Sequence, residues 1–118
     1  GAELAIVALG TLALAALEAA AGRPQWSVLD ARFAAPLDRD AVVEAARCGR
    51  VVTVEEGTRK GGLGSAVLEA LAEAGVPARV RVLGLPDAPV RHGDARAQRV
   101  ELGLDAAGIR RAAEELLG

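Results

Sequence analysis

The hydrophobic pattern of the chain alternates between short apolar runs and longer segments with helical spacing. Leu4–Ala8 is apolar at every position, which is typical of a strand buried on both faces of a parallel sheet. Further strands are predicted at 26–31, 51–54 and 80–83. Helices are predicted at 11–21, 38–48, 65–74 and 105–117, with a shorter helical stretch near 94–102.

This alternation predicts an α/β fold in three layers, with helices on both faces of a mainly parallel sheet. Because crossovers between parallel strands are right-handed, we expect the strand order 2-1-3-4. The fourth strand is predicted at an edge, since Ala78–Val82 alternates between apolar and charged residues.

Polar residues and glycines mark the ends of the predicted helices. Asp38 and Asp105 are suited to N-cap positions, Thr11 can cap the first helix, and Leu37 can pack as a hydrophobic staple. The first three main helices are expected to end at glycines: Gly22, Gly49 and Gly75.

The apolar run from Leu4 to Leu17 resembles a signal peptide or a membrane span in composition. Glu3 precedes it where a signal peptide is basic, and Gly10 and Thr11 interrupt it. It is also too short to cross a bilayer. We therefore interpret it as a buried strand that leads into an alanine-rich helix, and we expect no membrane partner.

The composition indicates one compact domain, 1–118, that does not bind nucleic acid. Just over half of the 118 residues are apolar, and the net charge is −2 with acidic and basic residues interspersed. Cys48 is the only cysteine, so no intrachain disulfide or cysteine-based metal site can form. This usage favours a reducing, cytoplasmic setting.

A glycine-rich segment, Glu55–Ser65, follows the third predicted strand and opens a helix. Backbone N–H groups at such a position favour anions, and Gly61, Gly62 and Gly64 allow close approach. The segment is neither a Walker A loop nor the dinucleotide fingerprint, which belongs after the first strand. A tight turn packed against neighbouring protein is the favoured interpretation.

Glu55 and Glu56 are adjacent, so on a strand they point to opposite faces and cannot easily share a substrate. We predict that one of them accepts hydrogen bonds from backbone N–H groups at a helix start, near Thr11 or near Gly64. The alternative is that both carboxylates face an open cleft and hold a metal or a cationic ligand.

His92 stands without the companions that a metal site needs, and we expect it to make a hydrogen bond in a loop or a subunit contact. Cys48 is interpreted as a small buried apolar residue at a helix end. The sequence therefore assigns no catalytic, cofactor-binding or metal-ligating residue to this chain.

Four segments in order resemble 1-deoxy-D-xylulose-5-phosphate synthases. They read VLDARFAAPLD from Val28, VVTVEEGTRKGGLGSAVLEAL from Val51, LGLPDAPVRHG from Leu83 and ELGLDAAGI from Glu101. The last two distinguish these synthases from transketolase and the pyruvate dehydrogenase beta subunit, which share the domain. Asp30 and Ala35 depart from the pattern, which has Asn and Lys there.

The resemblance implies the C-terminal, transketolase-like domain of a three-domain enzyme that condenses pyruvate with glyceraldehyde 3-phosphate. Thiamine diphosphate and magnesium would be bound by the other domains, and this domain would help to form a homodimer. The chain alone is then expected to be inactive, and its start at Gly1 without Met suggests a fragment. The alternative is a free-standing α/β binding or regulatory module that uses the Gly61–Ser65 loop for an anion.

Overall fold

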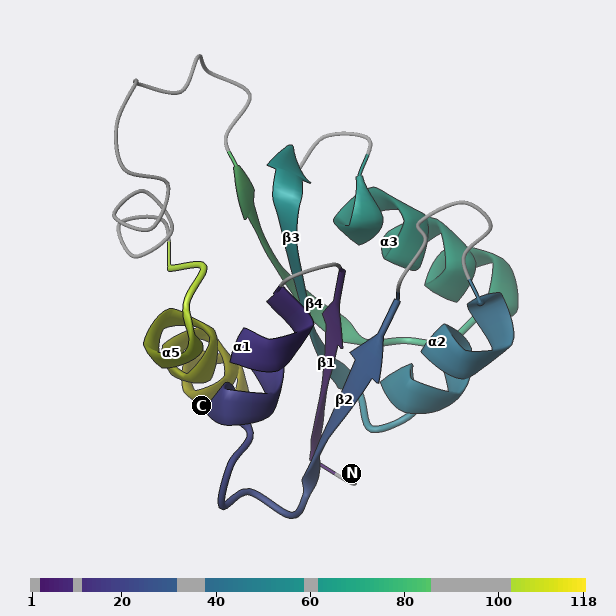
Figure 1. Ribbon diagram of the computed structural model, residues 1–118. Helices are drawn as coiled ribbons and strands as arrows, with labels where there is room; N and C mark the ends of the chain where they lie inside the picture. The colour runs from purple at the N-terminus through teal and green to yellow at the C-terminus, as the bar shows by residue number, and fades with distance from the viewer. Residues whose placement is uncertain (1–2, 10–11, 32–37, 59–61, 86–102) are drawn as a thin grey trace.

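The computed structural model describes residues 3–9, 12–31, 38–58, 62–85 and 103–118, which form a four-stranded sheet covered by helices (Figure 1). The strands are β1 (Leu4–Ala8), β2 (Trp26–Asp30), β3 (Arg50–Thr58) and β4 (Arg79–Leu85). The helices are α1 (Leu12–Ala19), α2 (Arg39–Ala46), α3 (Leu63–Ala74) and α5 (Ala106–Leu117).

The sheet has the order β2-β1-β3-β4, and every pairing within it is parallel. Leu4 lies opposite Trp26, and Ala5 lies opposite Val51, so β1 is central and pairs on both sides. This confirms the predicted order and explains why β1 is apolar throughout, since all five of its residues are buried. In the described sheet, β4 is an edge strand as expected.

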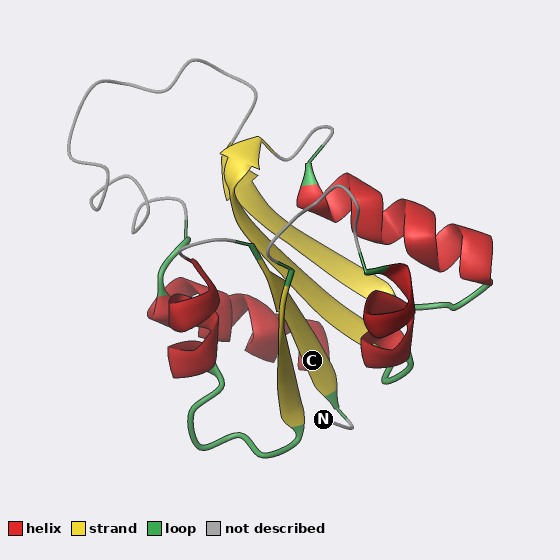
Figure 2. Ribbon diagram, turned by 45° about the vertical axis from the view of Figure 1, so that its right-hand side comes forward, coloured by secondary structure: helices red, strands yellow, loops and turns green. Residues whose placement is uncertain are grey.

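The helices divide between the two faces of the sheet, α1 and α5 on one and α2 and α3 on the other (Figure 2). Alternate residues of β1 therefore enter two separate cores. Leu4, Ile6 and Ala8 pack with α1 and α5, whereas Val7 packs with α2 and α3. With almost no aromatic residues, both cores consist mainly of alanine, valine, leucine and isoleucine, which lets helices lie close to the sheet.

Two of the predicted caps are confirmed by side-chain hydrogen bonds. Asp38 accepts from the N–H of Ala41 at 3.1 Å, and Asp105 accepts from the N–H of Gly108 at 2.9 Å. Gly75 ends α3 in the left-handed conformation, with φ of 69°. Gly22 and Gly49, the other predicted stops, also have positive φ.

Several predicted boundaries were wrong, most clearly around the glycine-rich segment. Strand β3 does not end at Val54 but continues to Thr58, with a shift in its register against β4 between these residues. Helix α3 begins at Leu63 rather than Ser65, so the connecting loop is shorter than predicted. A carboxylate can lie within the strand because Glu55 finds a buried partner, described below.

The remaining differences are small or fall outside the described residues. Helices α1 and α2 end about two residues early, at Ala19 and Ala46, and β4 extends to Leu85. Outside the described residues lie the proposed cap at Thr11, the staple at Leu37 and the short helix near 94–102.

Candidate functional site

The sheet order places a topological switch point between β1 and β3. In open α/β sheets, ligands usually bind where neighbouring strands lead the chain to opposite faces, outside their carboxyl ends. Here the N–H of Leu9, just beyond β1, donates to the carbonyl oxygen of Val54 in β3 at 3.0 Å. The two strands therefore run side by side up to the point where Glu55 follows.

The Glu55 carboxylate is built into this corner of the protein. Its side chain is buried, with the residue only 4% exposed, and its Oε1 accepts a hydrogen bond from the N–H of Leu63 at 2.7 Å. Leu63 is the first residue of α3, where backbone N–H groups lack partners within the helix. The prediction that one of the two glutamates accepts from a helix-start N–H is thus confirmed.

The sequence at the start of α3 explains why a distant side chain is needed. The N-cap residue is Gly62, which has no side chain and makes no capping hydrogen bond. Glu55 supplies the missing acceptor from the neighbouring strand, and its negative charge lies at the positive end of the helix dipole. Helix and strand are therefore connected at this corner by a buried, charge-assisted hydrogen bond.

Glu55 and Glu56 do not form a catalytic pair. Glu55 is buried on the α3 side of β3, whereas Glu56 is exposed, as expected for neighbours on a strand. An acid and a base that act on one substrate must both reach it, and these two side chains diverge. The alternative hypothesis, in which both carboxylates face an open cleft and hold a metal or a cationic ligand, is therefore wrong.

Gly64 allows α3 to approach the sheet. An added Cβ at this position would lie 2.7 Å and 2.9 Å from the two methyl groups of Val82 and 3.2 Å from the hydroxyl oxygen of Thr53. The glycine therefore accommodates neighbouring protein, which supports the tight-turn interpretation of this segment. Gly61 lies outside the described residues.

The N-terminus of α3 is a poor site for a phosphate or diphosphate. The Leu63 N–H already bonds to a carboxylate, which would also repel an incoming anion. Within the described ranges, no group of three or more His, Cys, Asp and Glu residues is arranged to hold a metal ion. The described residues at the start of α3 therefore do not fit the diphosphate of thiamine diphosphate, and no described group fits its magnesium ion.

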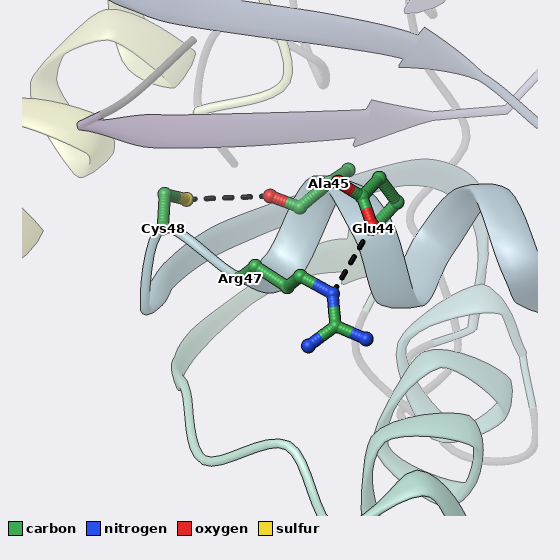
Figure 3. A network of polar contacts seen from close by, with 4 residues as sticks. All are labelled: Glu44, Ala45, Arg47 and Cys48. Atoms are coloured by element: carbon green, nitrogen blue, oxygen red, sulfur yellow. Dashed lines mark hydrogen bonds and ion pairs between the residues drawn. The ribbon is translucent and has the colours of Figure 1, made fainter.

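Cys48 lies at the end of α2 in a polar rather than an apolar setting (Figure 3). Its sulfur is 3.3 Å from the carbonyl oxygen of Ala45 and 3.2 Å from that of Arg50, and the residue is half-buried. Nearby, Arg47 bonds to Glu44 at 3.1 Å on the exposed side of the helix. The predicted place of Cys48 at a helix end is confirmed, but its interpretation as a buried apolar residue was wrong, because the residue is half-buried and its thiol contacts two backbone carbonyl oxygens. His92 lies outside the described residues.

A tight contact that the sequence analysis missed involves Gly103 and Gly108. Gly103 has a φ of 75°, which favours glycine, and the turn it forms leads into α5. An added Cβ on Gly108 would lie 2.5 Å from both the Cα and the carbonyl oxygen of Gly103. Gly103 and Gly108 lie on either side of the N-cap Asp105 in the sequence, but their spacing alone does not show that they meet.

No helix among the described residues is both long and apolar enough to cross a membrane. The first half of the Leu4–Leu17 run forms the central strand, and the second half lies in α1. Both parts contribute buried residues to the same core.

Comparison with known proteins relates the whole chain to one family. Residues 1–109 match the family model described as "Transketolase, C-terminal domain". The 1-deoxy-D-xylulose-5-phosphate synthase of Myxococcus xanthus is 64% identical over 115 residues, which cover 98% of this chain and 20% of the relative. That of Bordetella parapertussis is 56% identical over 119 residues, covering 100% of this chain and 19% of the relative.

The fold also matches a solved structure titled "Split gene transketolase, inactive beta4 tetramer". The TM-score is 0.85 at 38% sequence identity, and the match covers 99% of this chain and 40% of that one. The chain thus spans about a fifth of the length of the curated relatives named above.

Proposed function

Since the chain belongs to the transketolase C-terminal domain family, we propose that residues 1–118 form one accessory, dimer-interface domain of a 1-deoxy-D-xylulose-5-phosphate synthase. The observation that carries this proposal is the high identity to such synthases across nearly the full chain. The partners are then the other domains of the same enzyme and a second subunit.

The proposed reaction condenses pyruvate with glyceraldehyde 3-phosphate, releases carbon dioxide and gives 1-deoxy-D-xylulose 5-phosphate, a precursor of isoprenoids and thiamine. Thiamine diphosphate stabilises the carbanion that such chemistry requires. We place this cofactor and its magnesium ion in the other domains of a cytoplasmic homodimer. The residues of this chain contribute no step of the reaction.

The geometry at the end of β3 supports a structural role for this domain. The Glu55 carboxylate occupies the place at the start of α3 where an anionic group of a ligand would bind. Gly64 brings the first turn of α3 into contact with Val82 and Thr53. The carboxylate at the helix start and the close helix–sheet contact favour a structural role for this corner over anion binding.

A calorimetric titration tests the accessory role. The 118-residue chain is expected to bind neither thiamine diphosphate nor Mg²⁺ measurably, because strong sites for hard cations need several converging oxygen ligands. Titration of inorganic phosphate serves as the control for a simple anion site at Gly61–Ser65. Micromolar binding of the cofactor would contradict the accessory role, and binding of phosphate would favour the anion-binding module.

A further inference from the structure

Helix α1 is apolar on almost every side. Its sequence is LALAALEA, in which Glu18 is the only charged residue. A helix of this composition is normally covered all round. One side of α1 does enter the core through Leu12, Ala16 and Ala19, but on the other side Leu14 and Leu17 are 65% and 57% exposed.

The other described helices present charged residues to solvent. The exposed positions of α2 include Arg39, Asp40 and Glu44, and those of α5 include Arg111 and Glu114. On α3, Leu68 is 48% exposed, but Glu69 and Glu73 are exposed beside it. Among the described helices, the outward face of α1 is therefore the exception to the amphipathic rule.

The helix that carries this apolar face packs against the core on its inner side. Leu14 and Leu17 are neighbours on one side of the helix because they are separated by one turn. The turn after α1 is connected to α5 by an ion pair between Arg23 and Glu114 at 2.6 Å, and Arg23 also stacks on Trp26 at 4.9 Å. Glu18, which is exposed on the same helix, borders the two leucines, and an apolar centre with charge at its border has the anatomy of a protein interface.

The path of the chain indicates which partner can reach this face. The polypeptide enters β1 at the same end of the sheet where the connection after α1 returns to β2 (Figure 1). There the N–H of Glu3 donates to the carbonyl oxygen of Gln25 at 3.0 Å. The family model describes a C-terminal domain and the relatives are about five times as long, so a domain that precedes this one would connect at this end of the sheet.

We propose that the outward face of α1, centred on Leu14 and Leu17, is the surface on which an earlier domain of the same polypeptide docks. This inference rests on the proposed function, since it requires that such a domain exists. Docking would bury the two exposed leucines, and the removal of their apolar surface from water would stabilise the contact. Leu68 on α3, which lies among the exposed charged residues Glu69 and Glu73, is expected to remain accessible.

Cysteine accessibility in the full-length synthase tests this surface directly. Leu14→Cys, Leu17→Cys and the control Leu68→Cys are each treated with a maleimide in the native state, and labelling is quantified by peptide mass spectrometry. Positions 14 and 17 are expected to react at least about tenfold more slowly than position 68, since they react only when the interface opens. Equal labelling rates at the three positions in the native protein would overturn the proposal. Labelling in denaturant is the control, where the three cysteines should react at equal rates.

Repeating the labelling on diluted protein distinguishes docking by an earlier domain of the same polypeptide from contact with a second copy of the chain. Protection that persists when light scattering shows the protein to be monomeric supports docking within one polypeptide. Protection that disappears together with the oligomer would overturn it and assign the face to a subunit contact. Product formation is measured in parallel: a protein that protects positions 14 and 17 but makes no product supports docking and refutes only the proposed function.

Discussion

Replacing Gly108 by alanine is expected to lower the free energy of unfolding by about 3 kcal/mol. The new Cβ would lie 2.5 Å from backbone atoms of Gly103, which cannot rotate away as the end of a side chain can. Either α5 or the turn before it must move, and this disturbs the packing of Leu104 and Ile109 in the core. Urea unfolding followed by circular dichroism measures the change.

Whether Gly108→Ala lowers or raises the free energy of unfolding shows whether the contact with Gly103 or helix propensity dominates. Propensity alone favours alanine over glycine inside a helix by about 1 kcal/mol, so it predicts a stabilised variant. Arg111→Ala, an exposed change in the same helix, is the control and should alter stability by no more than about 0.5 kcal/mol. A Gly108→Ala variant as stable as the parent would show that the contact at Gly103 is not maintained in solution.

Replacing Glu55 by alanine is expected to cost about 2–3 kcal/mol, since it leaves the buried Leu63 N–H without its acceptor. Gly62 has no side chain that could take over, and water has little access to this N–H, because Leu63 is fully buried and Glu55 is only 4% exposed. The same urea unfolding experiment detects the loss.

A conservative variant shows whether the hydrogen bond or the charge dominates. Glu55→Gln keeps an acceptor oxygen but removes the negative charge from the positive end of α3, so it should cost about 1 kcal/mol. Glu69→Ala, on the exposed side of α3, is the matched control and should change little. If Glu55→Ala unfolds no more easily than Glu69→Ala, the carboxylate does not hold this corner.

The strand order could be predicted from the sequence because parallel sheets impose strong, local signals. An uninterrupted apolar strand such as Leu4–Ala8 must be central, and the alternation around Arg79 and Arg81 must lie at an edge. The role of Glu55 was also predictable to within one residue, because a carboxylate near a helix start has few better partners than the unpaired N–H groups.

Other features of the structure could not be predicted, because they depend on contacts between distant segments that no local sequence pattern encodes. The length of β3 was missed because glutamate and glycine normally end a strand, whereas here Glu55 is satisfied by α3. The contact of Gly108 with Gly103 requires a left-handed turn whose direction becomes evident only in three dimensions. The exposure of Leu14 could not be predicted either, because a helix with so few charged residues is normally buried on all sides.

The central claim is that this chain is one domain of a synthase whose chemistry lies elsewhere. The most direct measurement is product formation from pyruvate and glyceraldehyde 3-phosphate, with thiamine diphosphate and Mg²⁺, by the full-length polypeptide and by the 118-residue chain in parallel. We expect the full-length protein to release carbon dioxide and form 1-deoxy-D-xylulose 5-phosphate, and the short chain to form none. Product from the short chain, or none from a folded full-length protein loaded with cofactor, would contradict the account.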